Sequence, residues 1–228
     1  MDYAGWTHWY DTSVRSVVFS LILLTVSHFA VSEEPTWRTV EEVLAVVGNT
    51  PILHSDVTLA ALVHIVEPEM MEPLVDYRSR LLGARIRLEV EFRDLEDTGL
   101  LFRLELETGT YRDALIARAG GEEVLETSLR HEGLVWPDVD ELVLRVAAVD
   151  AFVEQRLRPR ISVTMEEIEA AYQELLVNEI AISDEPVPPL SAVRDDLHTL
   201  LVERKLNEEI ESWLERAEEH QEVMRFGR

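Results

Sequence analysis

The chain of 228 residues carries 45 Asp and Glu residues against 21 Lys and Arg residues, which gives a formal net charge of −24. Its apolar fraction of 46% is enough to build a hydrophobic core and excludes intrinsic disorder of the whole chain. The negative charge disfavours nucleic acid and anionic lipid as partners, and the absence of cysteine excludes disulfides and thiolate zinc sites.

Residues 1–32 have the features of a signal peptide. Arg15 precedes an apolar run over residues 17–31, and Ala30 and Ser32 place small side chains at the −3 and −1 positions of a cleavage site after Ser32. The run of about 15 residues is shorter than the roughly 20 that a membrane-spanning helix needs. We therefore expect a cleaved leader, a linker over residues 33–42, a periplasmic location and no stable membrane span. An uncleaved anchor and an N-terminal core helix are the alternatives.

Two short apolar segments follow the linker and predict a β-hairpin. The β-branched run over residues 43–47 and the segment over residues 50–53 are separated by Gly48 and Asn49, which tolerate positive φ. Because Pro51 has no N–H to donate, the second strand is expected at the edge of its sheet.

The next part of the chain has helical periodicity. Ser55 is the expected N-cap of a helix over residues 56–66. A helix over residues 74–97 carries one apolar stripe, and its Arg and Glu residues are expected largely between the apolar positions. Thr164 and Glu167 form a capping box for a helix over residues 165–177. Further helices are expected over residues 110–119, 122–132 and 136–158.

A connector separates this helical region from the C-terminal segment. Residues 179–190 contain three prolines and no periodicity. Within residues 191–228 we expect a long amphipathic helix with Trp213 on its apolar face, then a short strand over residues 223–226 that can join the hairpin. The predicted fold is mainly α, with a multi-helix core over residues 43–178, a small β-hairpin, and a C-terminal segment that packs back on the core.

Three segments resemble the SurA-like family of periplasmic chaperones, which is related to parvulin-associated chaperones. Residues 44–49 read LAVVGN before Ser55-Asp56, and here the Asn-Gly order of the family's turn is transposed. Residues 158–168 read RPRISVTMEEI, similar to the family's link after its N-terminal region, and residues 204–214 read RKLNEEIESWL, similar to its closing helix. The resemblance implies a SurA-like helical core in an exported chaperone.

One part of that family's pattern is missing. The family places one or two parvulin domains between the last two helices, whereas this chain has only residues 179–190 there. So short a segment cannot form a core of its own. The resemblance therefore implies a protein that binds unfolded or partly folded polypeptides, such as outer-membrane protein precursors, and is not an enzyme because it lacks the prolyl isomerase. The alternative is a dedicated adaptor or assembly subunit that binds one folded partner through the same scaffold.

No catalytic, cofactor-binding or metal site is predicted. The seven histidines have no paired ligand spacing, and His131-Glu132 lacks the second histidine of a zinc-binding helix. The candidates for polypeptide contact are Met70 and Met71, whose soft side chains suit variable partners, and Trp136. For each of them, packing against a neighbouring helix is the alternative.

Overall fold

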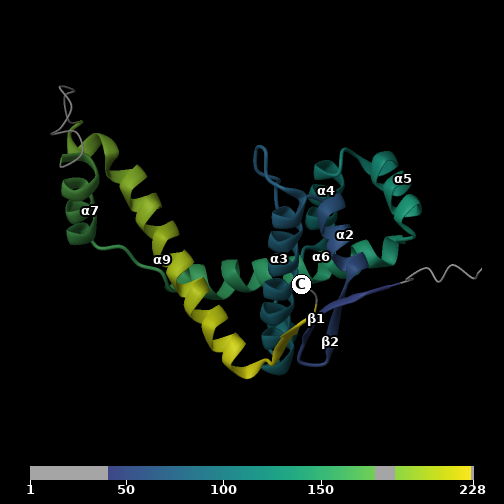
Figure 1. The fold of residues 1–228 in the computed structure, drawn as a ribbon. Helices are drawn as coiled ribbons and strands as arrows, with labels where there is room; N and C mark the ends of the chain where they lie inside the picture. Colours follow the sequence, from purple (N-terminus) through teal and green to yellow (C-terminus); the bar gives the residue numbers. More distant parts are fainter. Residues whose placement is uncertain (1–40, 178–187, 227–228) are drawn as a thin grey trace, which may run out of the picture. The chain divides into compact units, whose positions relative to one another are not determined.

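A computed structural model of the chain describes residues 41–177 and 188–226. The fold is mainly helical with a small antiparallel sheet, as predicted (Figure 1). The predicted leader lies outside the described residues, as do most of the linker and most of the connector. The α-helices and strands are β1 (Val43–Val47), β2 (Thr50–Leu53), α2 (His54–Leu62), α3 (Leu74–Asp97), α4 (Thr108–Arg118), α5 (Glu122–Glu132), α6 (Trp136–Phe152), α7 (Met165–Tyr172), α9 (Leu190–His220) and β3 (Val223–Arg225).

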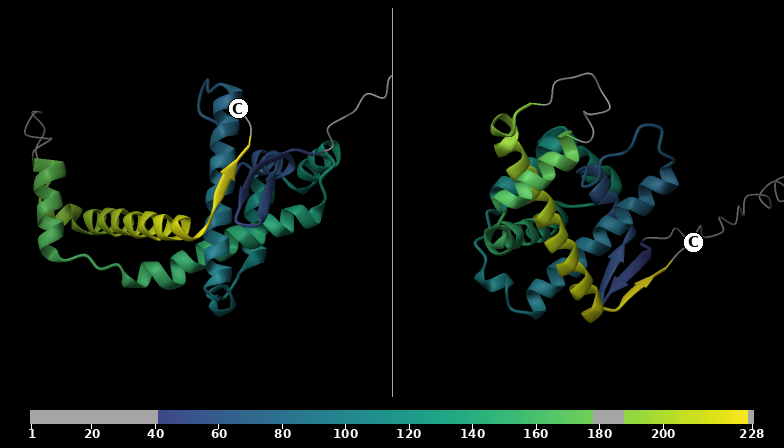
Figure 2. Two further views of the ribbon diagram at one scale, coloured as in Figure 1. Left: turned by 60° about the horizontal axis from the view of Figure 1, so that its bottom comes forward. Right: turned by 90° about the vertical axis from the view of Figure 1, so that its left-hand side faces the viewer.

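The sheet joins the two ends of the described chain. Its strand order is β2-β1-β3, and both pairings are antiparallel, so β1 is central and the strand that contains Pro51 is at an edge, as predicted (Figure 2). Gly48 turns the hairpin with a φ of +57°, and its N–H donates to the carbonyl of Glu222 at 2.8 Å. The predicted C-terminal strand therefore completes the sheet that the hairpin begins.

The boundaries of α2 differ from the prediction. The helix begins at His54, before the expected N-cap Ser55, because the Asp56 carboxylate reaches back and accepts the Leu53 N–H at 2.7 Å. It ends at Leu62 instead of residue 66. His64 has a φ of +49°, which stops the right-handed helix.

The helix predicted over residues 136–158 changes its winding near its end. The α-helix stops at Phe152, a π-helical turn follows over Val153–Leu157, and a 3-10 turn follows over Arg158–Arg160. Pro159 lacks the N–H that an α-helical turn needs, which accounts for the break at that point. The predicted capping box of α7 is confirmed, because Thr164 Oγ1 accepts the N–H of Glu167 and Glu167 Oε2 accepts the N–H of Thr164.

The long C-terminal helix α9 has two packing partners. Its C-terminal half packs on α3 and α6 through Trp213 and Leu206, in a cluster with Phe92 and Phe152. Its N-terminal half packs against α7 through Leu197 and Leu201, in a separate cluster. The final helix therefore returns to the N-terminal helices, in agreement with the predicted C-terminal segment that packs back on the core.

Three charged residues of α3 are buried, which corrects the expectation that its charges lie between the core positions. Arg85, Glu89 and Glu91 are only 5%, 2% and 5% exposed. Glu91 lies at the contact between α3 and α9, where Arg87 donates both to it at 3.0 Å and to Glu211 of α9 at 2.8 Å. Burial raises the pKa of Glu91 above its ordinary value, although the charge of Arg87 opposes the rise.

We expect the substitution Glu91→Gln to stabilise the protein increasingly as the pH rises above about 4, the ordinary pKa range of a glutamate. A carboxylate whose folded pKa is raised costs stability once the pH passes its unfolded pKa, and this cost grows until the pH exceeds the folded pKa. Glutamine keeps the shape without that ionisation. Urea unfolding at several pH values measures the difference between the variant and the wild type. Glu211→Gln, which removes the more exposed partner of Arg87, is the control. The expectation would be contradicted if the difference in unfolding free energy between Glu91→Gln and the wild type stayed constant or shrank as the pH rises.

Candidate functional site

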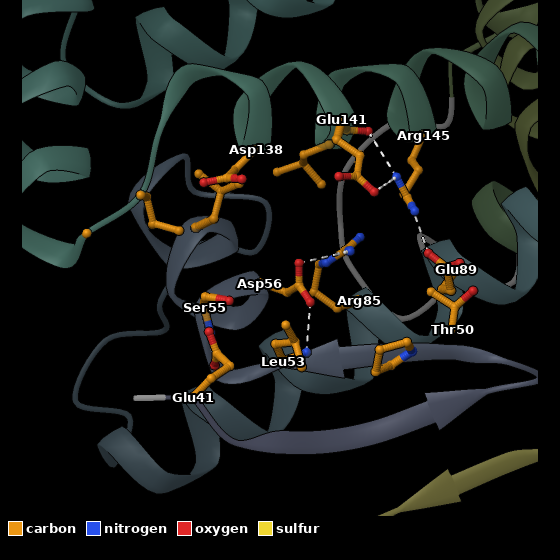
Figure 3. A pocket seen from close by; sticks show the side chains of 15 residues that line it. Glu41, Thr50, Leu53, Ser55, Asp56, Arg85, Glu89, Asp138, Glu141 and Arg145 are labelled. Atoms are coloured by element: carbon orange, nitrogen blue, oxygen red, sulfur yellow. Dashed lines mark hydrogen bonds and ion pairs between the residues drawn. The ribbon is translucent and has the colours of Figure 1, made fainter. Parts of the chain in front are cut away.

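Two of the three charged side chains that are buried in the described part of the chain, Arg85 and Glu89, line a cleft of about 460 Å³ (Figure 3). Its walls come mainly from four elements: β2, the first two turns of α2, the middle of α3, and α6 with the loop before it. Glu41, which precedes β1, completes the lining. The lining residues are Glu41, Thr50, Pro51, Leu53, Ser55, Asp56, Leu59, Arg85, Glu89, Gly133, Leu134, Asp138, Glu141, Leu142 and Arg145.

Arg145 of α6 is held from two sides at this cleft. Its Nε donates to Glu89 Oε2 of α3 at 2.7 Å, and its Nη1 pairs with Glu141 Oε1 one turn earlier on α6 at 2.9 Å. The guanidinium also lies 5.0 Å from the centre of the Phe92 ring. Burial disfavours the charged form, but the hydrogen bond to Glu89 and the nearby carboxylates outweigh it, so the pKa of Arg145 is raised. This arginine is a satisfied structural cation.

Arg85 is the less satisfied arginine. Its side chain is 7% exposed, and its closest carboxylate oxygen is Asp56 Oδ1, 3.9 Å from Nη2, which is too far for a hydrogen bond. Nη1 has no hydrogen-bond partner within residues 41–177 and 188–226. Figure 3 shows the side chain reaching from α3 into the cleft. Burial lowers the pKa of Arg85 and raises that of Asp56, so each ion lacks solvation that the other only partly replaces.

Three other carboxylate contacts at the cleft cap the starts of helices. Asp138 accepts the N–H of Val135 at 2.8 Å before α6, and Asp56 accepts that of Leu53 before α2. Glu41 accepts the N–H of Ser55 at 3.2 Å. Negative charge is favourable at helix N-termini, which explains why carboxylates gather here. In total, five carboxylates and two guanidiniums line the cleft.

The chemistry available in the cleft is recognition of polar groups. Arg85 offers an unused N–H donor, and the carboxylates exceed the cations. In the part of the chain that the structure describes, no group of three or more His, Cys, Asp or Glu residues is arranged to hold a metal ion. This cleft was not predicted from the sequence. The available signal was that Arg85 and Glu89 follow Leu81 at helical spacings of four residues and so share its buried stripe.

The predicted contact residues Met70 and Met71 lie in the loop between α2 and α3, which precedes the N-terminal end of α3 in Figure 1. Each is 95% exposed, which rules out the alternative that they pack against a neighbouring helix within the described fold. Leu74 and Val75, which begin α3, are 65% and 77% exposed. We call these four residues the methionine loop. It is a run of apolar side chains directed to solvent.

Polar contacts hold this loop in place. Arg80 of α3 donates two hydrogen bonds of 2.7 Å to the Glu72 carboxylate and one of 2.9 Å to the carbonyl of Glu67. The Tyr77 hydroxyl donates to the carbonyl of Val66 at 3.0 Å. Met71 itself has a φ of +65°, a backbone conformation that is unfavourable for residues other than glycine. Hydrogen bonds thus hold the residues on both sides of the exposed methionines, and the backbone of Met71 carries local strain.

Trp136, the third predicted contact residue, lies in a different cluster. Its ring is half-buried and packs against the core formed by α2, α4, α5 and α6. The guanidinium of Arg112 lies 4.5 Å from the ring centre, and Asp140 holds that guanidinium at 3.2 Å. These contacts are those of a packing residue.

Two further observations concern the chain as a whole. Among the described residues, no helix combines the length and the apolar character required to cross a membrane. No protein-family model and no curated protein matches this chain.

Proposed function

We propose that the protein is an exported, chaperone-like polypeptide-binding protein without prolyl isomerase activity, whose ligands are unfolded or partly folded chains such as outer-membrane protein precursors. The observation that carries the proposal is the methionine loop. The segments similar to SurA-like chaperones give it further support. A periplasmic location is part of the same proposal.

The methionine loop suits ligands of variable sequence. Apolar burial is non-directional, and the unbranched thioether side chains of Met70 and Met71 adapt to differently shaped partners. Leu74 and Val75 extend the apolar surface onto the first turn of α3. Because Arg80 and Tyr77 bond to residues on both sides of the two methionines, the ends of this segment are already held before a ligand binds, which lowers the entropy that binding costs. Exposed apolar residues on a fixed loop are otherwise unfavourable in water, which supports a binding role.

The double substitution Met70→Ser and Met71→Ser is expected to weaken suppression of aggregation. Full burial of one methionine side chain contributes about 1.5–3 kcal/mol, and the variant loses two of them, so at least about tenfold more of the variant should be needed for equal effect. The assay dilutes an unfolded outer-membrane β-barrel protein from urea into buffer that contains the full chain, and light scattering follows aggregation.

Phe102→Ser is the matched control, because this side chain is 90% exposed but lies in the turn after α3. It should leave the suppression unchanged. The proposal fails if the wild-type chain has no effect at several-fold molar excess, or if the double variant and the wild type act equally. A saturable complex with one folded protein, without affinity for unfolded chains, would instead support the adaptor.

A further inference from the structure

We infer that the cleft between β2, α2, α3 and α6 binds an extended, basic segment of a polypeptide: Arg85 takes a main-chain carbonyl, and the carboxylates take the neighbouring lysine or arginine side chain. None of the cleft's lining residues belongs to the methionine loop. The inference therefore goes beyond the proposed function, because it assigns a second site that selects its ligand by charge.

The first step is the unpartnered donor. Arg85 is 5% exposed, and its Nη1 makes no hydrogen bond to any described residue. A buried guanidinium keeps its charge, so it cannot relieve the missing contact by losing a proton. Nη1 is itself buried, so the side chain has to shift toward the cleft before a ligand's acceptor oxygen can reach it, and that contact restores the hydrogen bond that burial has taken away.

The second step is the sign of the charge around that donor. Five carboxylates line the cleft, and the two guanidiniums do not balance them. An anionic acceptor would be repelled, whereas the neutral carbonyl of a peptide group would not be. Glu141 pairs with Arg145 through one oxygen, and its side chain is 65% exposed, so it can also meet a second cation. A peptide residue with a basic side chain supplies the carbonyl and the cation together.

The free edge of β2 limits how a peptide can bind in the cleft. Although β2 is an edge strand, it cannot be extended by another strand along its length, because Pro51 has no N–H and the N–H of Leu53 is bonded to Asp56. Recognition therefore depends on side chains of the cleft. Its volume of about 460 Å³ lies within the range of about 300–1,000 Å³ typical of ligand pockets.

The test uses three hexapeptides, acetylated and amidated at their ends, in which serine alternates with lysine, norleucine or glutamate. Calorimetry at about 150 mM salt measures their affinity for the full chain, since salt at this concentration screens attraction to the acidic surface. We expect the lysine peptide to bind best and the glutamate peptide worst. The variant with Met70→Ser and Met71→Ser should bind the lysine peptide as the wild type does, so a failure here is distinguishable from a failure of the proposed function.

Two substitutions separate the two contacts. Glu141→Gln should weaken binding of the lysine peptide about threefold, whereas Glu126→Gln should not, because Glu126 forms an equivalent pair with Arg130 on α5, outside the cleft. Arg85→Met should weaken it about tenfold by removing the donor. Electrostatics alone predicts the opposite change in affinity, since removing the positive charge of Arg85 favours binding of a cationic peptide. Butylamine, which has no carbonyl, should therefore bind Arg85→Met at least as well as the wild type.

Three results would overturn the inference. They are tighter binding of the glutamate peptide than of the lysine peptide, equal weakening of lysine-peptide binding by Glu141→Gln and Glu126→Gln, and stronger binding of the lysine peptide to Arg85→Met than to the wild type. Urea unfolding establishes that each variant is folded. If Arg85→Met does not fold, Arg85→Lys serves in its place, because lysine keeps the charge and lacks Nη1. Arg85→Lys should also weaken binding of the lysine peptide.

Discussion

Arg145→Met is expected to lower the free energy of unfolding by about 3–5 kcal/mol. Arg145 neutralises Glu89, whose side chain is 2% exposed, through a hydrogen bond of 2.7 Å. Methionine preserves much of the volume and the apolar contact with Phe92, but it leaves the Glu89 carboxylate without its partner inside the protein. Urea denaturation followed by circular dichroism measures the loss.

Two comparisons establish that the loss comes from the buried carboxylate. Arg130→Met removes an ion pair with Glu126 that has a similar N–O distance, 2.8 Å, but lies on an exposed helix face. It should lower the free energy of unfolding by less than about 1 kcal/mol. The double substitution Glu89→Leu and Arg145→Met removes both charges and should recover most of the stability. A loss below about 1 kcal/mol for Arg145→Met alone would show that Glu89 is stabilised in another way.

Trp213→Ala should also lower the free energy of unfolding, by about 3–5 kcal/mol. Trp213 is 5% exposed, its ring centre lies 4.5 Å from that of Phe152, and its Nε1 donates to Asp94 at 2.8 Å. Alanine leaves a cavity where α9 meets α3 and α6, and it leaves Asp94 without this donor. Because the substitution removes a fluorescent group, circular dichroism is the suitable probe.

Leu200→Ala on the same helix is the control, because this side chain is 45% exposed and its removal opens no cavity. It should cost less than about 1 kcal/mol. Trp213→Phe should lie between the two, since it keeps the aromatic contact with Phe152 and loses the hydrogen bond to Asp94. Equal stability of Trp213→Ala and Leu200→Ala would mean that α9 is not anchored at this contact.

Local chemistry explains which elements could be predicted from the sequence. The boundaries of α3 and α5 follow from apolar periodicity and from Gly99 and Gly133 just beyond their ends. The hairpin follows from Gly48, and the start of α7 from Thr164 with Glu167. These signals succeed because each acts between residues close in the chain.

The errors arose where a more distant residue, or a different hydrogen bond, replaced the expected one. Ser55 is a good N-cap in isolation, but Asp56 caps the chain from within α2 and moves the helix start. After Phe152 the chain changes to a π-helical and then a 3-10 turn, a change of winding that apolar periodicity does not predict. The helix of residues 74–97 was expected to keep its charges outside the core, yet Arg85, Glu89 and Glu91 are buried. The charge of Glu89 is balanced by Arg145 of another helix, which the sequence of α3 alone does not show.

The candidate sites divide in the same way. The two methionines of the methionine loop could be identified from the sequence, because Met70 and Met71 lie between prolines outside a periodic segment and have no local element to cover them. Their exposure and the role of Arg80 in fixing the loop were decided by the structure. The charged cleft could not be assembled from the sequence, since Asp56, Arg85 and Arg145 come from three separate helices.

By itself, therefore, the sequence determined the mainly helical class, the hairpin, the third strand and the amphipathic final helix, because hydrophobic periodicity and turn chemistry are local properties. Only the tertiary structure decided which charges are buried, which arginine keeps an unused donor, and which apolar side chains remain in water. Burial and ion pairing depend on residues far apart in the chain, such as Glu89 of α3 and Arg145 of α6. Their positions are set when the helices pack.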